Sequence, residues 1–159
     1  VGTDLSKDMI DFGKIKVQRS KNKDKITLKL GDGVTIPEKN ASYDVITVAF
    51  GIRNFPDYKT SLKNMVRVLK PGGRALILEF SLPESSIIRV PYLFYFRNVL
   101  PRIGNLLSGH NDAYTYLNQT VEDFPYGEAF VAQMKKAGFA SVRTKVLSFG
   151  IATLYIGDK

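Results

Sequence analysis

Residues 43–50 (YDVITVAF) form a nearly continuous run of β-prone apolar side chains, and this run constrains the fold more than any other feature. Such a run is typical of a strand that is buried in a parallel sheet. A helical apolar spacing follows over residues 62–69, and residues 74–80 (RALILEF) form a second buried run. Strand, helix and strand in this order predict a parallel sheet wrapped by helices.

A short strand, a helix start and a second strand are predicted before this unit. Residues 1–4 (VGTD) look like the end of a strand, and Ser6 can cap a helix that follows it. Residues 26–30 alternate between apolar and polar side chains and stop at the glycine-containing turn 31–33.

Glycine and proline mark the ends of the helices that are predicted after residue 62. The helix after the first long strand is expected to end at residues 70–73 (KPGG), because proline cannot continue a helix. Gly138 ends a further helical stripe, and residues 141–148 and 149–156 are predicted to be two final strands. With an antiparallel last strand, these elements predict a single α/β domain over residues 1–159.

The composition excludes several kinds of site. Hydrophobic residues make up 44% and charged residues 24% of the 159, which is ordinary for a globular protein. The absence of cysteine excludes disulfides, thiolate metal sites and cysteine nucleophiles. His110 is the only histidine and is expected to be structural, so no metal site is predicted. No apolar run approaches the roughly 20 residues of a membrane span.

The net charge is +8. The largest cluster of basic residues lies between Lys14 and Lys29, which contains seven basic residues and one acid, Asp24. Three interpretations remain open: a solvated face, contact with an anionic membrane surface, and nucleic-acid binding. The third is the weakest, because no aromatic residue is interleaved for base stacking, and no nucleic-acid partner is expected.

Acids and glycine follow the predicted strands at the edge where open parallel sheets bind ligands. Asp4 in this position can accept hydrogen bonds from ribose hydroxyls, but it can equally be an ordinary helix-capping acid. Asp32 and Gly33 would suit an adenine edge packed flat against the backbone, and a simple turn is the alternative. The sequence alone leaves both choices open.

Arg53 lies in the FGIRN segment that follows residues 43–50. A buried arginine is expensive without a partner, so Arg53 can orient an anionic or carbonyl oxygen of a substrate or form a structural salt bridge. Residues 87–100 contain 10 apolar or aromatic side chains among 14 and are interrupted by Pro91. The serines lack a nucleophile-elbow context, which argues against a hydrolase.

Seven segments carry a family resemblance, in the order TDLSKDMI, LGDGVTIP, YDVITVAFGIRNFPD, RVLKPGGRALILEFSLP, VLPRIGNLLSG, DAYTYLNQTVEDFP and FVAQMKKAGF. With them the chain resembles the UbiE-type methyltransferases of ubiquinone and menaquinone biosynthesis over nearly its whole length. LKPGG occurs in many class I methyltransferases, whereas FGIRN followed by LKPGG, LEFS and LPRIG is specific to this family.

The resemblance implies a Rossmann-like class I methyltransferase sheet, mostly parallel with an antiparallel last strand, and S-adenosylmethionine as the methyl donor. The family's first strand and glycine-rich loop would precede Val1, so the chain resembles the family without its N-terminal part. In the family's sheet that strand lies between the strand ending at Asp4 and residues 43–50. Without it, these two strands are expected to pair directly or to be covered by a second copy, with weak cofactor binding and a homo-oligomer as the result.

The resemblance also implies cofactor contacts. Asp4 matches the acid that holds the ribose, and Asp32 and Gly33 match the pair beside the adenine. Ala49 falls where family members line the cofactor pocket, often with serine.

On the substrate side, Arg53 matches the arginine of FG(I/L)RN, and Asp112 and Tyr116 match the DxYxYL segment that covers the substrate. Methylation of a quinol carbon needs a cation that stabilises the phenolate and a base for the ring proton. Arg53 is the candidate cation and Asp112 a candidate for the base. The isoprenoid tail of such a substrate would suit residues 87–100, for which a core or cap helix is the alternative.

We therefore expect an S-adenosylmethionine-dependent C-methyltransferase that acts on a polyprenylated benzoquinol or naphthoquinol. It is expected in the cytoplasm, with peripheral contact to the inner membrane face as a further expectation. Two alternatives are a methyltransferase of sterols or small phenols, and a non-catalytic methyltransferase-like scaffold or regulatory subunit that has lost cofactor binding.

Overall fold

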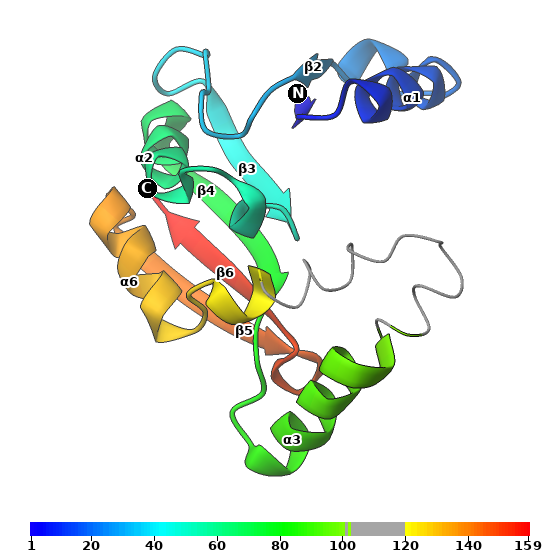
Figure 1. Ribbon diagram of the computed structural model, residues 1–159. Coiled ribbons are helices and arrows are strands. Elements are labelled where there is room, and N and C mark those ends of the chain that lie inside the picture. Colours follow the sequence, from blue (N-terminus) through cyan, green and yellow to red (C-terminus); the bar gives the residue numbers. More distant parts are fainter. Residues whose placement is uncertain (101, 103–119) are drawn as a thin grey trace.

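The computed structural model describes residues 1–100, 102 and 120–159, and its strands form two separate sheets (Figure 1). The smaller sheet pairs β1 (Gly2–Asp4) with β2 (Leu28–Leu30) in parallel. The larger sheet contains, in this order, β3 (Tyr43–Ala49), β4 (Leu69–Phe80), β6 (Ala152–Asp158) and β5 (Ser141–Leu147). Strands β3 and β4 are parallel, and β6 is antiparallel to both of its neighbours, so the α/β fold with an antiparallel last strand is confirmed.

No backbone pairing joins the two sheets within the described residues, so of the two expected outcomes, direct pairing or cover by a second copy, direct pairing of β1 with β3 is not found there. One edge of β3 is consequently unpaired, and Val45 in this strand is 52% exposed. The prediction of a fully buried strand at residues 43–50 is therefore wrong. Burial of such a strand requires a neighbour on each side and cover on both faces, and β3 has one neighbour.

Helix α1 (Lys7–Gln18) begins at Ser6, whose hydroxyl oxygen accepts a hydrogen bond from the Met9 N–H at 3.3 Å, which confirms the predicted cap. A short 3₁₀ turn, η1 (Lys23–Lys25), leads from α1 toward β2. Of the apolar side chains of α1, only Ile10 is buried. The other face of this helix is therefore largely open to solvent.

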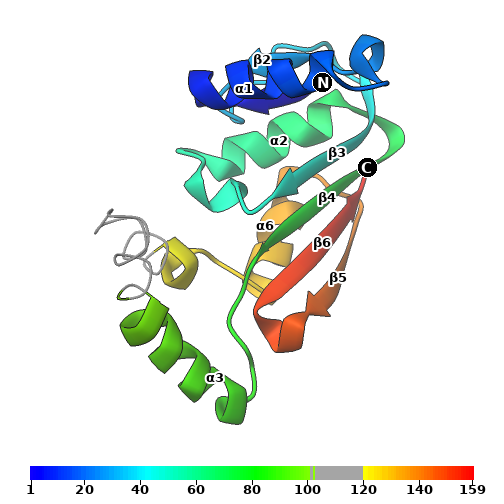
Figure 2. The same ribbon diagram turned by 90° about the vertical axis from the view of Figure 1, so that its right-hand side faces the viewer.

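Helices α2 (Tyr58–Val68) and α6 (Glu128–Ala137) cover one face of the larger sheet (Figure 1), and the main core lies beneath them. Its fully buried members include residues of α2, β4, α6 and β6, among them Leu62, Met65, Ala75, Ile77, Phe130, Met134 and Tyr155. Gly138 ends α6 in the left-handed conformation, as predicted. No helix of the described residues covers the opposite face, which is seen in Figure 2.

Helix α2 ends just before residues 70–73, where its end was predicted, and these residues are part of β4. Gly72 has a φ of +75°, and its N–H donates to the carbonyl oxygen of Lys159 at 3.2 Å, while the Lys159 N–H donates to the Gly73 carbonyl at 3.0 Å. The C-terminal residue therefore extends sheet pairing over the glycines. The register of β3 against β4 shifts at the same place, between Tyr43 and Val45.

Helix α3 (Ser86–Phe94) continues through Pro91 and leads into a π-helical turn, η3 (Tyr95–Val99). The expected interruption at Pro91 is therefore absent, because the helix continues with the loss of one N–H donor. Across the described part of the chain, no helix combines the length and apolar character needed to cross a bilayer.

Candidate cofactor and substrate site

A cavity of about 610 Å³ lies between the smaller sheet and β3. Its walls include Asp4 at the end of β1, Asp32 and Gly33 after β2, and Ala49 at the end of β3. The four residues predicted to contact a cofactor thus surround one space. Its volume falls in the range of about 300–1,000 Å³ that is usual for small-molecule sites.

Asp4 is exposed, and its Oδ1 accepts a hydrogen bond from the Ser6 N–H at 2.8 Å. The capping alternative is therefore realised in the structure. It does not compete with a ligand, because an ionised carboxylate has about four lone-pair sites. The bond from Ser6 instead fixes the direction of the carboxylate at the start of α1.

Backbone N–H groups of the turn that begins at Asp32 fix the carboxylate of this residue. Its Oδ1 accepts hydrogen bonds from the N–H groups of Thr35 at 2.7 Å and Val34 at 2.9 Å. These two bonds, that of Thr35 first, hold the pKa of Asp32 below its ordinary value, so the carboxylate stays charged at neutral pH. The turn alternative is thus also realised, and the second carboxylate oxygen keeps acceptor capacity for a ligand.

The backbone conformation of residue 33 and its contact with Phe55 require a glycine at this position. The φ of Gly33 is +72°, and a Cβ atom at this position would lie 2.3 Å from the ring of Phe55. Its carbonyl oxygen accepts a hydrogen bond from the hydroxyl of Ser61 at 2.6 Å. The backbone at this wall of the cavity is therefore fixed, and the ring of Phe55 fills the space that a side chain at residue 33 would need.

The turn after β3 is strained at Phe50, which has a φ of +53°. A non-glycine residue persists in this region only where its surroundings hold it. The Phe50 N–H donates to the Leu78 carbonyl at 2.8 Å, and its ring centroid lies 4.5 Å from that of Phe80. A 3₁₀ turn, η2 (Ile52–Asn54), follows and carries Arg53.

Arg53 forms a buried ion pair with Glu79 of β4. The Nη1 of Arg53 donates to Oε1 of Glu79 at 2.6 Å and to the Phe50 carbonyl at 2.7 Å. The two side chains are 8% and 0% exposed. The salt-bridge alternative for Arg53 is thus realised. The cavity lining includes the neighbouring residues Gly51 and Asn54 but not Arg53 itself.

One buried donor of Arg53, the Nε–H, has no hydrogen-bond partner among the described residues. A buried N–H without a partner costs about 1–3 kcal/mol. This unpaired Nε–H is a local cost of the buried ion pair, and Arg53 is not among the residues that line the cavity.

The sequence analysis missed Glu79, although a signal was present. Residues 74–80 alternate around the buried Ala75 and Ile77, and the same alternation places Glu79 inside the core. A buried carboxylate requires a cation. The nearest basic residue of the FGIRN turn was therefore its predictable partner.

Three residues singled out from the sequence, Asp112, Tyr116 and His110, lie outside the described residues. Among the residues that are described, no group of three or more histidine, cysteine or acidic side chains could hold a metal ion.

The order and directions of the strands and helices are those of the class I methyltransferase fold. One solved structure with this fold is a possible histamine N-methyltransferase from Thermotoga maritima, described as S-adenosylmethionine-dependent. It is 22% identical to the chain, covers 100% of it with 72% of its own length, and gives a TM-score of 0.65.

Comparisons of sequence identify the family. The model of the ubiE/COQ5 methyltransferase family matches residues 1–159, and the chain belongs to this family. A ubiquinone/menaquinone biosynthesis C-methyltransferase UbiE from Geobacter sulfurreducens is 45% identical over 159 residues, and a demethylmenaquinone methyltransferase from Deinococcus radiodurans is 43% identical over 159. The match covers 100% of this chain but 62% and 65% of these relatives, so the chain spans somewhat less than two thirds of their length.

Asp4 gives the first testable prediction. In the full-length protein, Asp4→Ala is expected to weaken binding of S-adenosylhomocysteine by about 1–3 kcal/mol, because charged hydrogen bonds to the ribose are lost. Ser6→Ala is the matched control, since it removes the cap of the same helix at a cost of about 1 kcal/mol in stability. Calorimetry should show a weaker affinity for S-adenosylhomocysteine in Asp4→Ala only. Equal affinities of Asp4→Ala and Ser6→Ala would mean that Asp4 does not contact the cofactor.

Proposed function

We propose that residues 1–159 act as one domain of an S-adenosylmethionine-dependent C-methyltransferase whose substrate is a polyprenylated benzoquinol or naphthoquinol in ubiquinone or menaquinone biosynthesis. The observation that carries this proposal is the cavity with Asp4, Asp32 and Gly33 around it, in a chain of the ubiE/COQ5 family. One of the two relatives is named a ubiquinone/menaquinone biosynthesis C-methyltransferase, and the other a demethylmenaquinone methyltransferase.

The residues of the cavity fit this cofactor. When bound, S-adenosylmethionine supplies a methyl group on a positively charged sulfur. Asp4 would accept hydrogen bonds from the ribose hydroxyls, and Asp32 would accept one from the adenine amino group. Gly33 would lie beside the adenine edge, and Ala49 would line the pocket at the end of β3.

Arg53 would act on the quinol. As the quinol hydroxyl loses its proton to water, the Arg53 guanidinium would stabilise the phenolate that makes the neighbouring ring carbon nucleophilic. The ring proton then leaves to water or to Asp112, and Tyr116 covers the substrate; both roles are carried over from the family resemblance.

A transfer assay tests the function. The full-length protein is incubated with methyl-labelled S-adenosylmethionine and a short-chain demethylated quinol, and label is expected on the ring carbon together with an equal amount of S-adenosylhomocysteine. Arg53→Lys is expected to lower kcat by about 10²-fold, because a point charge does not replace the planar fork. A protein that binds no S-adenosylhomocysteine would instead be the non-catalytic scaffold.

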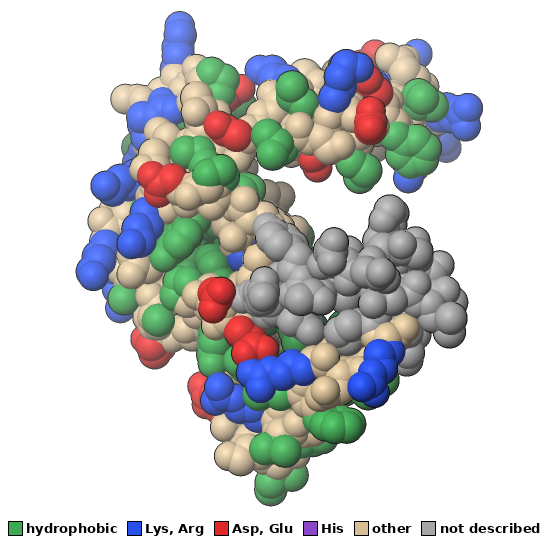
Figure 3. All heavy atoms as spheres, in the orientation of Figure 1, with side chains coloured by type: hydrophobic (Ala, Val, Ile, Leu, Met, Phe, Trp, Pro, Cys, Tyr) green, Lys and Arg blue, Asp and Glu red, His purple; other side chains and the backbone are tan. Residues whose placement is uncertain are grey.

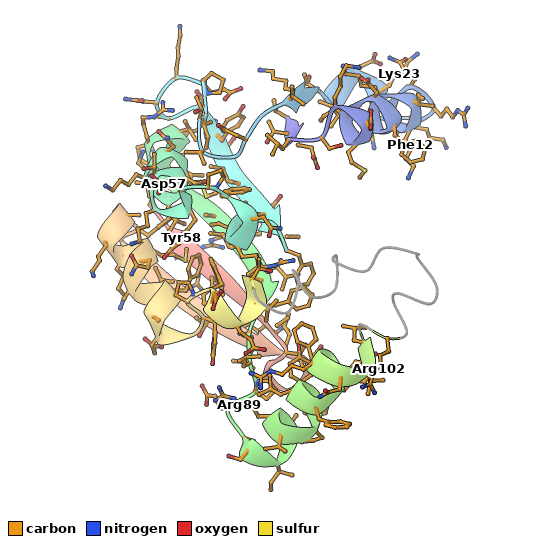
Figure 4. The ribbon with its side chains drawn as sticks, in the orientation of Figure 1. Phe12, Lys23, Asp57, Tyr58, Arg89 and Arg102 are labelled. Atoms are coloured by element: carbon orange, nitrogen blue, oxygen red, sulfur yellow. The ribbon has the colours of Figure 1, made fainter. Side chains whose placement is uncertain are left out.

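We further propose that the protein is cytoplasmic and contacts the inner membrane face. Helix α3 exposes an apolar stripe at helical spacing, Ile87 (86%), Val90 (67%) and Phe94 (64%). Figure 4 shows Arg89 on one side of α3 and Arg102 beyond the other end of this helix. The same grouping of green and blue surface is visible in Figure 3. Apolar side chains flanked by cations are suited to an anionic bilayer surface.

The protein is therefore expected to sediment with anionic vesicles, and the bound fraction should fall as salt rises. The double variant Ile87→Asp/Val90→Asp should lower the bound fraction several-fold. Val146→Asp, on an exposed part of β5, is the control and should bind as the unsubstituted protein does. Equal recovery in the supernatant with and without vesicles would count against membrane contact.

A further inference from the structure

Glu79 is a fully buried carboxylate on the face of β4 that otherwise carries the apolar core. Buried ion pairs contribute little to stability compared with apolar residues of similar size. Glu79 and Arg53 could therefore be replaced by a better packed apolar pair if stability were the only demand. The presence of this charged pair therefore indicates that the function of the site, and not stability, requires it.

The geometry shows what the carboxylate does. Its Oε1 accepts hydrogen bonds from Arg53 Nη1 at 2.6 Å and from the Phe80 N–H at 2.9 Å, and its Oε2 accepts the backbone N–H of Arg53 at 3.3 Å. One carboxylate thus holds both the backbone and the guanidinium of Arg53. The Phe80 ring flanks the guanidinium, 5.2 Å from its central carbon.

The same contacts fix the strained turn. Arg53 Nη1 also donates to the carbonyl of Phe50, the residue with positive φ. The ion pair therefore joins the end of β4 to η2 across the end of β3. Because Nη1 is engaged twice on one side, the orientation of the planar guanidinium is set, and with it the direction of the unpaired Nε–H.

We propose that Glu79 is the positioning residue of Arg53: it fixes the orientation of the guanidinium that acts on the quinol oxygen, and it neutralises the buried cation before the substrate arrives. This inference rests on the proposed function of the site. Glu79 itself touches neither substrate nor cofactor.

The test uses Glu79→Gln in the full-length protein, which keeps the size of the side chain and removes its charge. Its kcat is expected to fall by roughly 10²-fold through misplacement of Arg53, while the affinity for S-adenosylhomocysteine is unchanged. In an Arg53→Met background, Glu79→Gln should cause no further loss, because the effect passes through Arg53. Additive losses in the double variant would overturn the proposal.

A second measurement does not depend on turnover. The Arg53 Nε–H signal, assigned in ¹H–¹⁵N spectra by its loss in Arg53→Lys, is expected to shift when a non-reactive quinol analogue is added. In Glu79→Gln the signal should broaden and lose this response. An unchanged response would overturn the role of Glu79 even where the protein proves not to transfer methyl groups.

Controls separate the possible failures. Asp158→Asn removes an acid at the opposite end of the same strand pair, where it bonds Arg74, and should leave kcat and the Arg53 signal unchanged. If Glu79→Gln fails to fold, the apolar double variant Arg53→Met/Glu79→Met should fold and bind S-adenosylhomocysteine with low kcat. An active unsubstituted protein with a fully active Glu79→Gln variant would reject the positioning role and leave the proposed function standing.

Discussion

Replacing Arg53 by alanine is expected to lower the free energy of unfolding by about 3–5 kcal/mol, because the substitution leaves Glu79 charged, fully buried and without its cation. Two of the hydrogen bonds that reach the carboxylate are lost or weakened, and the Phe50 carbonyl loses the donor that helps to hold its strained backbone. Urea unfolding followed by circular dichroism measures the change.

The Arg74–Asp158 pair provides the matched control. Its N–O distance is also 2.6 Å, but its side chains are 48% and 26% exposed. Exposed pairs contribute about 0–1 kcal/mol, so Arg74→Ala should change the midpoint only slightly. Equal losses for the two variants would mean that burial of the Arg53 pair does not matter, and that the described contacts of Glu79 are not those that hold the fold.

The expected instability changes how variants of Arg53 are to be interpreted. A low rate in Arg53→Ala can come from a disturbed turn after β3 as well as from a missing cation. Arg53→Lys keeps a charge near Glu79, and the double variant with Glu79→Met removes the buried charge altogether. Comparison of these variants separates the chemical role of the guanidinium from its structural role.

Local signals in the sequence predicted the ends of several elements. Ser6 as helix cap and Gly138 as helix end depend on one turn of backbone and its nearest donors, so a short segment is enough to specify them. The order of strands and helices, and the antiparallel last strand, also followed from patterns in the chain. The grouping of Asp4, Asp32, Gly33 and Ala49 around one cavity agrees with the family resemblance; their roles stay predictions.

The errors concern partners that lie far away in the sequence. Residues 70–73 join β4 because Lys159 supplies backbone pairing from the other end of the chain. The exposure of β3 reflects a missing neighbour, which a pattern within the strand cannot show. Arg53 was left between two interpretations because its carboxylate partner is 26 positions away and went unnoticed.

The same open strand leads to the last prediction, which concerns assembly. Within the part of the chain that the structure describes, one edge of β3 is unpaired, and residues 45–49 of this strand carry no charge. The uncovered face of the larger sheet adds apolar side chains that are only partly buried, Leu76, Leu78, Leu154 and Ile156. The other sheet edge, β5, is protected by Arg143 and Lys145 in the way that natural proteins protect exposed edges. Association through β3 and the adjoining face would satisfy the unpaired backbone groups and bury this surface.

A chain of residues 1–159 is therefore expected to form a dimer or larger assembly, with a light-scattering mass of about twice 17.8 kDa or more. Val45→Lys places a charge on the open strand and should shift the chain toward monomer. Val146→Lys is the matched control, because Val146 is similarly exposed, at 61%, but lies on the edge already protected by charge. Calorimetry on the same sample should show weak or no binding of S-adenosylmethionine, since the cavity would be covered or distorted by the partner. A monomer with micromolar affinity would refute both expectations, and dissociation by Val146→Lys alone would assign the contact to β5.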